Sequence, residues 1–169
     1  MKKQAAFSLA KSPEQHQQWD ALLNRLVDAQ QLDYAVLMAH VLIYDDLCHL
    51  LGLRLRTDSL PERERLPMFA GVTGLALAGS RFAKDRETLN FLNNARNEVA
   101  HRTDRSRFEE AARQFAQRSC NDDDDEYRLE GFEWPPEEKK KVENFCFGLF
   151  VWQAKLGDLK LEFDPDLSA

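Results

Sequence analysis

Residues that could act on a phosphate ester gather in one short segment of the chain, 89–102. An imidazole can take up or release a proton near neutral pH, and a guanidinium can bind a phosphate with two parallel hydrogen bonds. Asn93, Asn97 and His101 are spaced four residues apart, so on a helix they form one polar line. Arg96 lies about 100° around the helix axis from Asn97. Arg96 and His101 therefore meet only if the helix ends or bends at His101, or if a second copy of the helix faces the first.

The elements that must position this line are helices, because nearly every periodic stretch repeats near 3.6 residues and no alternating strand pattern is present. The sequence therefore predicts an all-α fold. The polar line belongs to a helix expected to begin near Lys84 or Asp85 and to end close to His101. Other helices are predicted over 12–30, 33–52, 106–120 and 135–156, and 68–77 forms a short close-packed helix or a turn. The predicted ends of these helices are Ser12 before Pro13, Asp33 as N-cap, Gly52 and Gly157 as stops, and a capping box of Ser106 with Glu109.

Two of the predicted helices, 33–52 and 135–156, are apolar almost all the way round. Such helices lie at the centre of a bundle or against another subunit, and their combined apolar surface predicts a homodimer. The helix over 33–52 leaves a narrow polar strip that must find partners: His40, Tyr44, Asp45 and His49. Asp45 and His49 could supply two metal ligands, but no second ligand pair stands out, which favours a buried hydrogen-bonded pair and no metal site.

The hexapeptide Arg96-Asn97-Glu98-Val99-Ala100-His101 resembles the signature of the HEPN superfamily, the higher eukaryotes and prokaryotes nucleotide-binding domain. The resemblance implies an antiparallel bundle, here of five helices, that dimerises through its central and C-terminal helices with the motif near the interface. In active members of the family the motif cleaves RNA without a metal ion, so no cofactor is expected.

The resemblance also assigns roles to individual residues. His101 would act as general acid or base at the ribose 2′-hydroxyl or the leaving oxygen, Arg96 would bind the scissile phosphate, and Asn97 would orient His101. Three further arginines are expected to bind RNA phosphates: Arg102, Arg105 and Arg107.

Local charge agrees with this assignment. Between Arg81 and Arg118 nine Lys and Arg residues stand against six Asp and Glu residues, which predicts a basic face on an otherwise acidic chain. A competing interpretation pairs Arg96 with Asp45 or Asp46, and leaves His101 as a favourable charge at a helix C-terminus.

Many HEPN domains are non-catalytic, and the sequence shows no aromatic platform interleaved with the basic residues for stacking bases. The alternative function is therefore a regulatory or scaffolding module that binds a protein or a nucleotide.

The segment 121–138 carries nine acidic residues and one basic residue. A solvated loop between helices is the simplest interpretation. A Ca²⁺ or Mg²⁺ site is a weaker one, because Asp122–Glu126 lacks the alternate spacing and the glycine of an EF-hand loop. A further hypothesis is that this run mimics phosphate and competes for the basic face.

Composition sets the remaining expectations. A chain of 169 residues with 43% hydrophobic residues and a net charge of −6 predicts one domain over 1–169, with an acidic loop at 121–134 and a short C-terminal tail at 158–169. Three cysteines without a CxxC pair, and the lack of a signal peptide or membrane span, favour the cytoplasm. Common hydrolase, zincin, NTPase and dinucleotide-binding motifs are absent. The leading hypothesis is a metal-independent endoribonuclease of toxin or defence type, whose partners are RNA, a second copy and an antitoxin protein.

Overall fold

The computed structural model describes residues 12–57, 68–101, 104–121, 126–128 and 132–168. All regular secondary structure within these ranges is helical, which confirms the predicted all-α class. The described residues form six α-helices and two 3₁₀ turns: α2 (Pro13–Asp28), α3 (Leu32–Thr57), α4 (Phe69–Leu77), η1 (Ala83–Asp85), α5 (Arg86–His101), α6 (Arg105–Cys120), α7 (Glu138–Phe163) and η2 (Pro165–Ser168).

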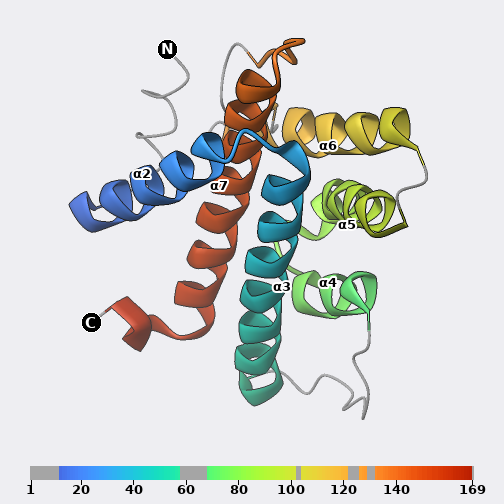
Figure 1. Ribbon diagram of the computed structural model, residues 1–169. Coiled ribbons are helices and arrows are strands. Elements are labelled where there is room, and N and C mark those ends of the chain that lie inside the picture. The colour runs from blue at the N-terminus through green and yellow to red at the C-terminus, as the bar shows by residue number, and fades with distance from the viewer. Residues whose placement is uncertain (1–11, 58–67, 102–103, 122–125, 129–131, 169) are drawn as a thin grey trace.

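The two longest helices, α3 and α7, lie side by side and run in the same direction (Figure 1). Near their beginnings the Leu32 N–H donates a hydrogen bond to Glu138 Oε1 (3.2 Å). Near their ends the Arg54 guanidinium lies 5.2 Å from the centre of the Phe163 ring. The expectation of an antiparallel bundle is therefore wrong for this central pair.

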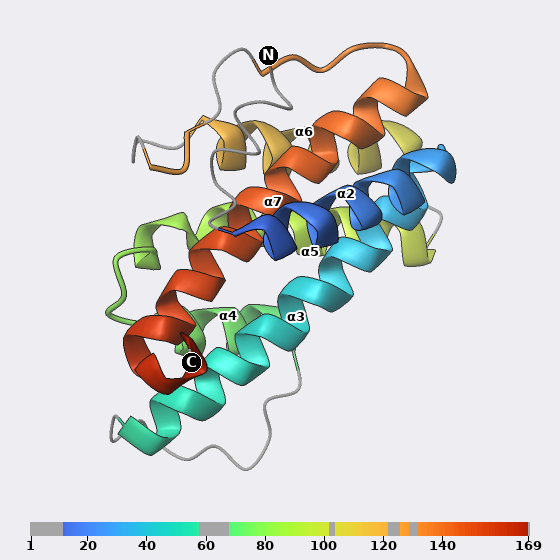
Figure 2. The same cartoon turned by 90° about the vertical axis from the view of Figure 1, so that its left-hand side faces the viewer.

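The other helices pack around α3 and α7. On one side α4, α5 and α6 are stacked across the two long helices, with α4 and α5 against α3 and α6 against α7 (Figure 1). An ion pair of 2.8 Å between Arg118 of α6 and Glu87 of α5 shows that these two helices run antiparallel. On the other side α2 crosses α7 (Figure 2), and the Trp19 ring lies 4.2 Å from the Phe150 ring.

Both long helices continue past the glycines expected to stop them, so 158–163 belongs to α7 and not to a tail. A glycine inside a helix costs about 1 kcal/mol relative to alanine. The buried contacts of the helical residues that follow each glycine outweigh this cost. After Gly52, Arg54 is buried and donates a 2.8 Å hydrogen bond to the Ala76 carbonyl at the end of α4. After Gly157, Leu159 is buried and Lys160 forms an ion pair with Asp46.

The predicted beginnings of the helices are confirmed in part. Helix α3 begins at Leu32, so Asp33 lies in its first turn and is not its N-cap. Ser12 Oγ accepts a hydrogen bond from the Gln15 backbone (3.2 Å), as the capping sequence predicts. For α6 the cap is Asp104 and not Ser106, because Asp104 Oδ1 accepts from the backbone N–H groups of Ser106 and Arg107. A hydrogen bond from the Ser106 hydroxyl, together with these two backbone bonds, lowers the pKa of the Asp104 carboxyl.

The apolar surface of α7 was one reason to predict a dimer, and the structure buries that surface within one chain. Every residue from 144 to 152 is buried within one chain, under α2, α3 and α6, so the apolar surface of this helix needs no second subunit. The described part of α3 keeps two exposed apolar residues four positions apart, Leu37 and Val41, and Val41 is 52% exposed. The length and composition of Leu32–Arg54 would also allow a membrane span, although α3 here packs against α4, α5 and α7 as a core helix does.

Candidate functional site

Helix α5 turns one face to the core and the other to an open pocket. Its buried side chains are Thr88, Leu89, Leu92 and Ala95. The pocket, of about 350 Å³, lies between α3, the beginning of α4 and α5, and contains the polar part of the motif. The residues that line it are His40 and Tyr44 of α3, Met68, Phe69 and Ala70 at the beginning of α4, and Asn93, Arg96 and Asn97 of α5.

His40 joins α3 to α5 in this pocket. Its Nε2–H donates to Asn93 Oδ1 (3.3 Å), so the polar strip predicted on this helix does find a partner. The His40 ring stacks on Phe69 with 4.4 Å between ring centres, and lies nearly parallel to Tyr44 at 6.4 Å. Burial lowers the pKa of His40, and the nearby charge of Arg96 lowers it further, against an opposing effect of the Asn93 hydrogen bond. The lowered pKa favours the neutral imidazole, and in the tautomer that donates from Nε2 to Asn93 the acceptor is Nδ1.

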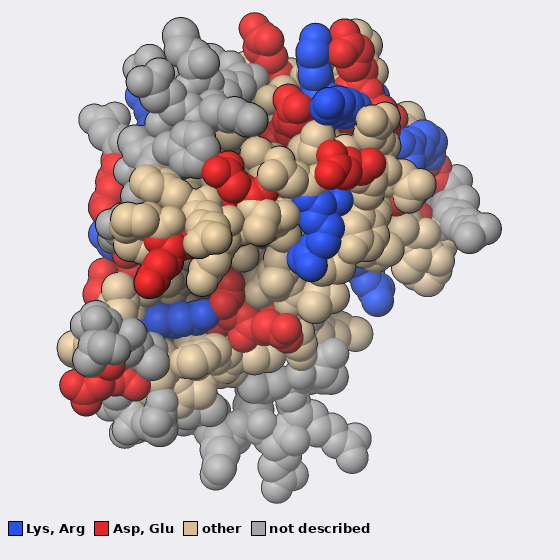
Figure 3. Space-filling view, turned by 60° about the vertical axis from the view of Figure 1, so that its left-hand side comes forward, with Lys and Arg blue, Asp and Glu red and all other residues tan. Residues whose placement is uncertain are grey.

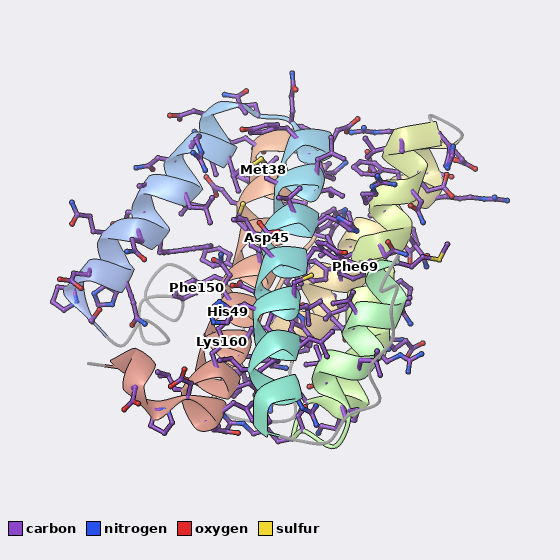
Figure 4. The ribbon with its side chains drawn as sticks, turned by 90° about the horizontal axis from the view of Figure 1, so that it is seen from below. Met38, Asp45, His49, Phe69, Phe150 and Lys160 are labelled. Atoms are coloured by element: carbon purple, nitrogen blue, oxygen red, sulfur yellow. The ribbon has the colours of Figure 1, made fainter. Side chains whose placement is uncertain are left out.

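Arg96 is exposed at the edge of the pocket. Its Nη1 donates a hydrogen bond to Asn97 Oδ1 (3.2 Å), and no carboxylate pairs with it among the described residues. The interpretation that pairs Arg96 with an aspartate of α3 is wrong. Asp46 pairs with Lys160, and Figure 4 shows Asp45 and Lys160 on the side of α3 that faces away from Phe69.

His101 is exposed at the C-terminal end of α5 and does not line the pocket that holds Arg96. The helix is regular up to His101, so within one chain Arg96 and His101 are not brought together. In the described part of the chain Asn97 accepts its hydrogen bond from Arg96, and none joins it to His101. Arg96 and His101 could therefore meet if a second copy of the chain faces the first, and not through a bend of α5.

The expected phosphate-binding arginines are differently placed. Arg102 lies outside the described residues. Arg105 is held by three carboxylates at once, those of Asp33, Glu109 and Glu138. The third arginine, Arg107, is largely exposed and lies 3.5 Å from Asp104.

Other basic residues of the 81–118 stretch are also paired. Arg113 binds Glu110, Arg118 binds Glu87, and Arg81 lies near Glu126 and Glu162. On the α2 side of the molecule, the face drawn in Figure 3, basic and acidic side chains also lie together. The predicted basic face is therefore largely neutralised by carboxylates. Among the described arginines of this stretch, Arg86 and Arg96 are exposed without a carboxylate partner, and Arg96 is the one that lines the pocket of the motif.

Two sets of acidic residues were candidates for metal binding. Asp122–Asp125 lie outside the described residues, so the phosphate-mimic hypothesis for this run stays a prediction. Asp45 and His49 are both exposed, and the expected buried pair does not form. Among the described residues no group of three His, Cys, Asp or Glu side chains could hold a metal ion.

The sequence interpretation missed the aromatic side of the pocket. Tyr44 and Phe69 come from different helices and lie 6.3 Å apart, between ring centres, beside Arg96. The order of residues along the chain does not show these rings beside a basic residue, because α3, α4 and α5 bring them together. A signal was present in the polar strip of α3 and in the four asparagines of α5, two of which, Asn93 and Asn97, form hydrogen bonds at this pocket.

Comparison with known proteins adds no family assignment, because no family model, no curated protein and no solved structure matches this chain.

Proposed function

We propose that this protein is a metal-independent endoribonuclease, acting at a composite cleft where two copies of the chain bring together Arg96, Asn97 and His101. The observation that carries the proposal is the state of Arg96. Its guanidinium is exposed, its described hydrogen bond goes to a neutral amide, and no carboxylate is among the described residues that line its pocket. An arginine in this state can bind a phosphate without first giving up an ion pair.

The chemistry requires a proton acceptor, a proton donor and a cation. One group removes the proton of the ribose 2′-hydroxyl, the 2′-oxygen attacks phosphorus, and the bond to the 5′-oxygen breaks as that oxygen gains a proton. His101, exposed at the end of α5, has the residue type to move these protons. Arg96 would stabilise the charge that develops on the phosphoryl oxygens.

A second copy is part of the proposal, because Arg96 and His101 of one chain lie on different sides of α5. Leu37 and Val41 on α3, together with Met68 at 71% exposure, give an apolar surface next to the pocket. A partner seated on this surface could bring its own His101 toward the Arg96 of the first chain. In a toxin, an antitoxin would cover the same cleft.

A non-catalytic regulatory or scaffolding module is the second candidate. It is favoured by the separation of His101 from the Arg96 pocket within one chain and by the three carboxylates that hold Arg105. Such a module would use the pocket to bind a protein or a nucleotide, and it would leave RNA intact.

The test is an RNA-cleavage assay in EDTA with purified protein. Arg96→Lys should cut much more slowly while it keeps RNA binding at low salt, because lysine retains the charge but not the two-pronged contact. Asn97→Ala should reduce cleavage and leave the fold intact, and His101→Ala should abolish cleavage and retain binding. His49→Ala is the matched control, since His49 is also exposed but lies on another helix. If all three variants match the wild type, or if the wild type needs added metal, the nuclease is excluded and the binding module stands.

A further inference from the structure

The pocket that holds Arg96 differs in charge from its neighbours along α5. A second pocket, between α5 and α6, is lined by Glu98, Glu110 and Arg107, and a third is lined by both acidic and basic side chains: Asp85, Glu87, Lys84, Arg113 and Arg118. Among the described residues that line the Arg96 pocket, Arg96 is the charged one and the other polar groups are neutral. An anionic ligand is therefore favoured beside Arg96, whereas in the third pocket Arg113 and Arg118 are already paired with Glu110 and Glu87.

The lining also contains a wall of aromatic rings. Phe69 forms its buried base, at 5% exposure, and the His40 ring covers one side of Phe69. The Tyr44 ring lies 6.3 Å from Phe69, inclined by 24°, and remains partly exposed. Nearly parallel rings beside a cation provide the two contacts that a single nucleotide needs, one for the base and one for the phosphate.

We propose that this pocket binds one unpaired nucleotide of an RNA strand, with the base against the partly exposed ring of Tyr44, above the buried Phe69, and the adjoining phosphate on Arg96. The volume of about 350 Å³ is at the small end of the range of roughly 300–1,000 Å³ typical of small-molecule sites, which suits one nucleotide and not several. That the nucleic acid is RNA rests on the proposed function. The pocket itself predicts the preference for a nucleotide.

The hydrogen bond between His40 and Asn93 leaves one donor and one acceptor available to bind the edge of the base. Because Nε2–H of His40 donates to Asn93 Oδ1, the Asn93 amide nitrogen is left as a donor and His40 Nδ1 as an acceptor. A base that stacks here must leave its own helix, since bases inside a duplex are already paired and stacked. The pocket therefore selects single-stranded segments, loops or ends.

The experiment measures binding in EDTA by calorimetry, with adenosine 3′-monophosphate, ribose 5-phosphate and inorganic phosphate as separate probes. The nucleotide should bind more tightly than either phosphate without a base. Tyr44→Leu should weaken nucleotide binding roughly 5- to 100-fold, the usual effect of losing one stacking ring, and should leave phosphate binding unchanged. Phe91→Leu is the control, because Phe91 is a partly buried aromatic of α5 that lines the neighbouring pocket.

Equal affinity for the three probes, or equal loss in Tyr44→Leu and Phe91→Leu, would overturn the nucleotide site. Fluorescence anisotropy with one labelled RNA, single-stranded and then annealed to its complement, should give tighter binding of the single strand. Cleavage is scored separately. Tyr44-dependent binding without cleavage removes the nuclease and keeps the pocket, whereas cleavage that is unaffected by Tyr44→Leu removes the pocket and keeps the nuclease.

Discussion

Gly148, in the middle of α7, lies where α6 packs closely against α7. A Cβ at this position would lie 3.0 Å from Ala116 Cα and 3.4 Å from Ser119 Cβ. The nearest atom belongs to the backbone, so helix α6 itself must move to make room. Gly148→Ala should gain about 1 kcal/mol of helix propensity and lose about 1–3 kcal/mol to overpacking. We therefore expect a net loss of stability of up to about 2 kcal/mol.

Gly157→Ala is the matched control, because it lies in the same helix and a Cβ there has nothing within 4 Å. It receives the same gain in helix propensity without the contact. The difference in the free energy of unfolding between the two variants isolates the overpacking, about 1–3 kcal/mol.

Urea unfolding followed by circular dichroism measures this difference. Thermal midpoints should separate by about 2–12 °C at about 2–4 °C per kcal/mol for a chain of this size. Equal stability of the two variants would refute the close contact between α6 and α7. If Gly157→Ala were less stable than the wild type, the continuous helix would be refuted and α7 would be expected to end at Gly157.

Three other predictions address the surface and the charges. The proposed pairing of two copies predicts that Val41→Asp gives a monomer by light scattering while Leu161→Asp leaves the pairing intact, since both residues are exposed but only Val41 lies beside the pocket. The pKa of His40, followed by NMR, should lie below 6.5 in the wild type and rise in Arg96→Gln, because the Arg96 charge opposes protonation; an unchanged value would place the two side chains apart. The hydrogen bond from Lys141 lowers the pKa of the Glu109 carboxyl, so stability from this pair is present above the ordinary Glu pKa of about 4.5 and is lost as the pH falls through the lowered value. Lys141→Met should flatten the acid side of a plot of urea midpoint against pH, and a parallel curve would contradict the pairing.

Sequence alone predicts a helix end correctly where residues close in the chain determine it. The Ser12 cap and the extent of α5 follow from residues within one or two turns, and the structure matches them. The ends of α3 and α7 were predicted wrongly because contacts from distant residues decide them. Arg54 reaches the carbonyl of Ala76 on α4, and Lys160 pairs with Asp46 on α3.

In the candidate site too, some features could be predicted from the sequence and others depend on contacts between helices. The motif places Arg96 and Asn97 on neighbouring positions of one helix, and both line the pocket. Phe69 could not be foreseen, because it reaches His40 only after α4 folds back against α3. Periodicity shows which residues share a helix face, but it does not show which helix that face will meet.

The central position of α7 has a consequence for synthesis on the ribosome. Helix α3 leaves the ribosome before α7, and at about 5–20 residues per second the roughly 80 residues between them take about 4–16 s. During this interval the apolar residues of α3 that pack on α7 have no partner. The nascent chain thus exposes a long apolar helix for seconds, and a ribosome-bound chaperone that recognises such segments would be expected to bind it until α7 emerges.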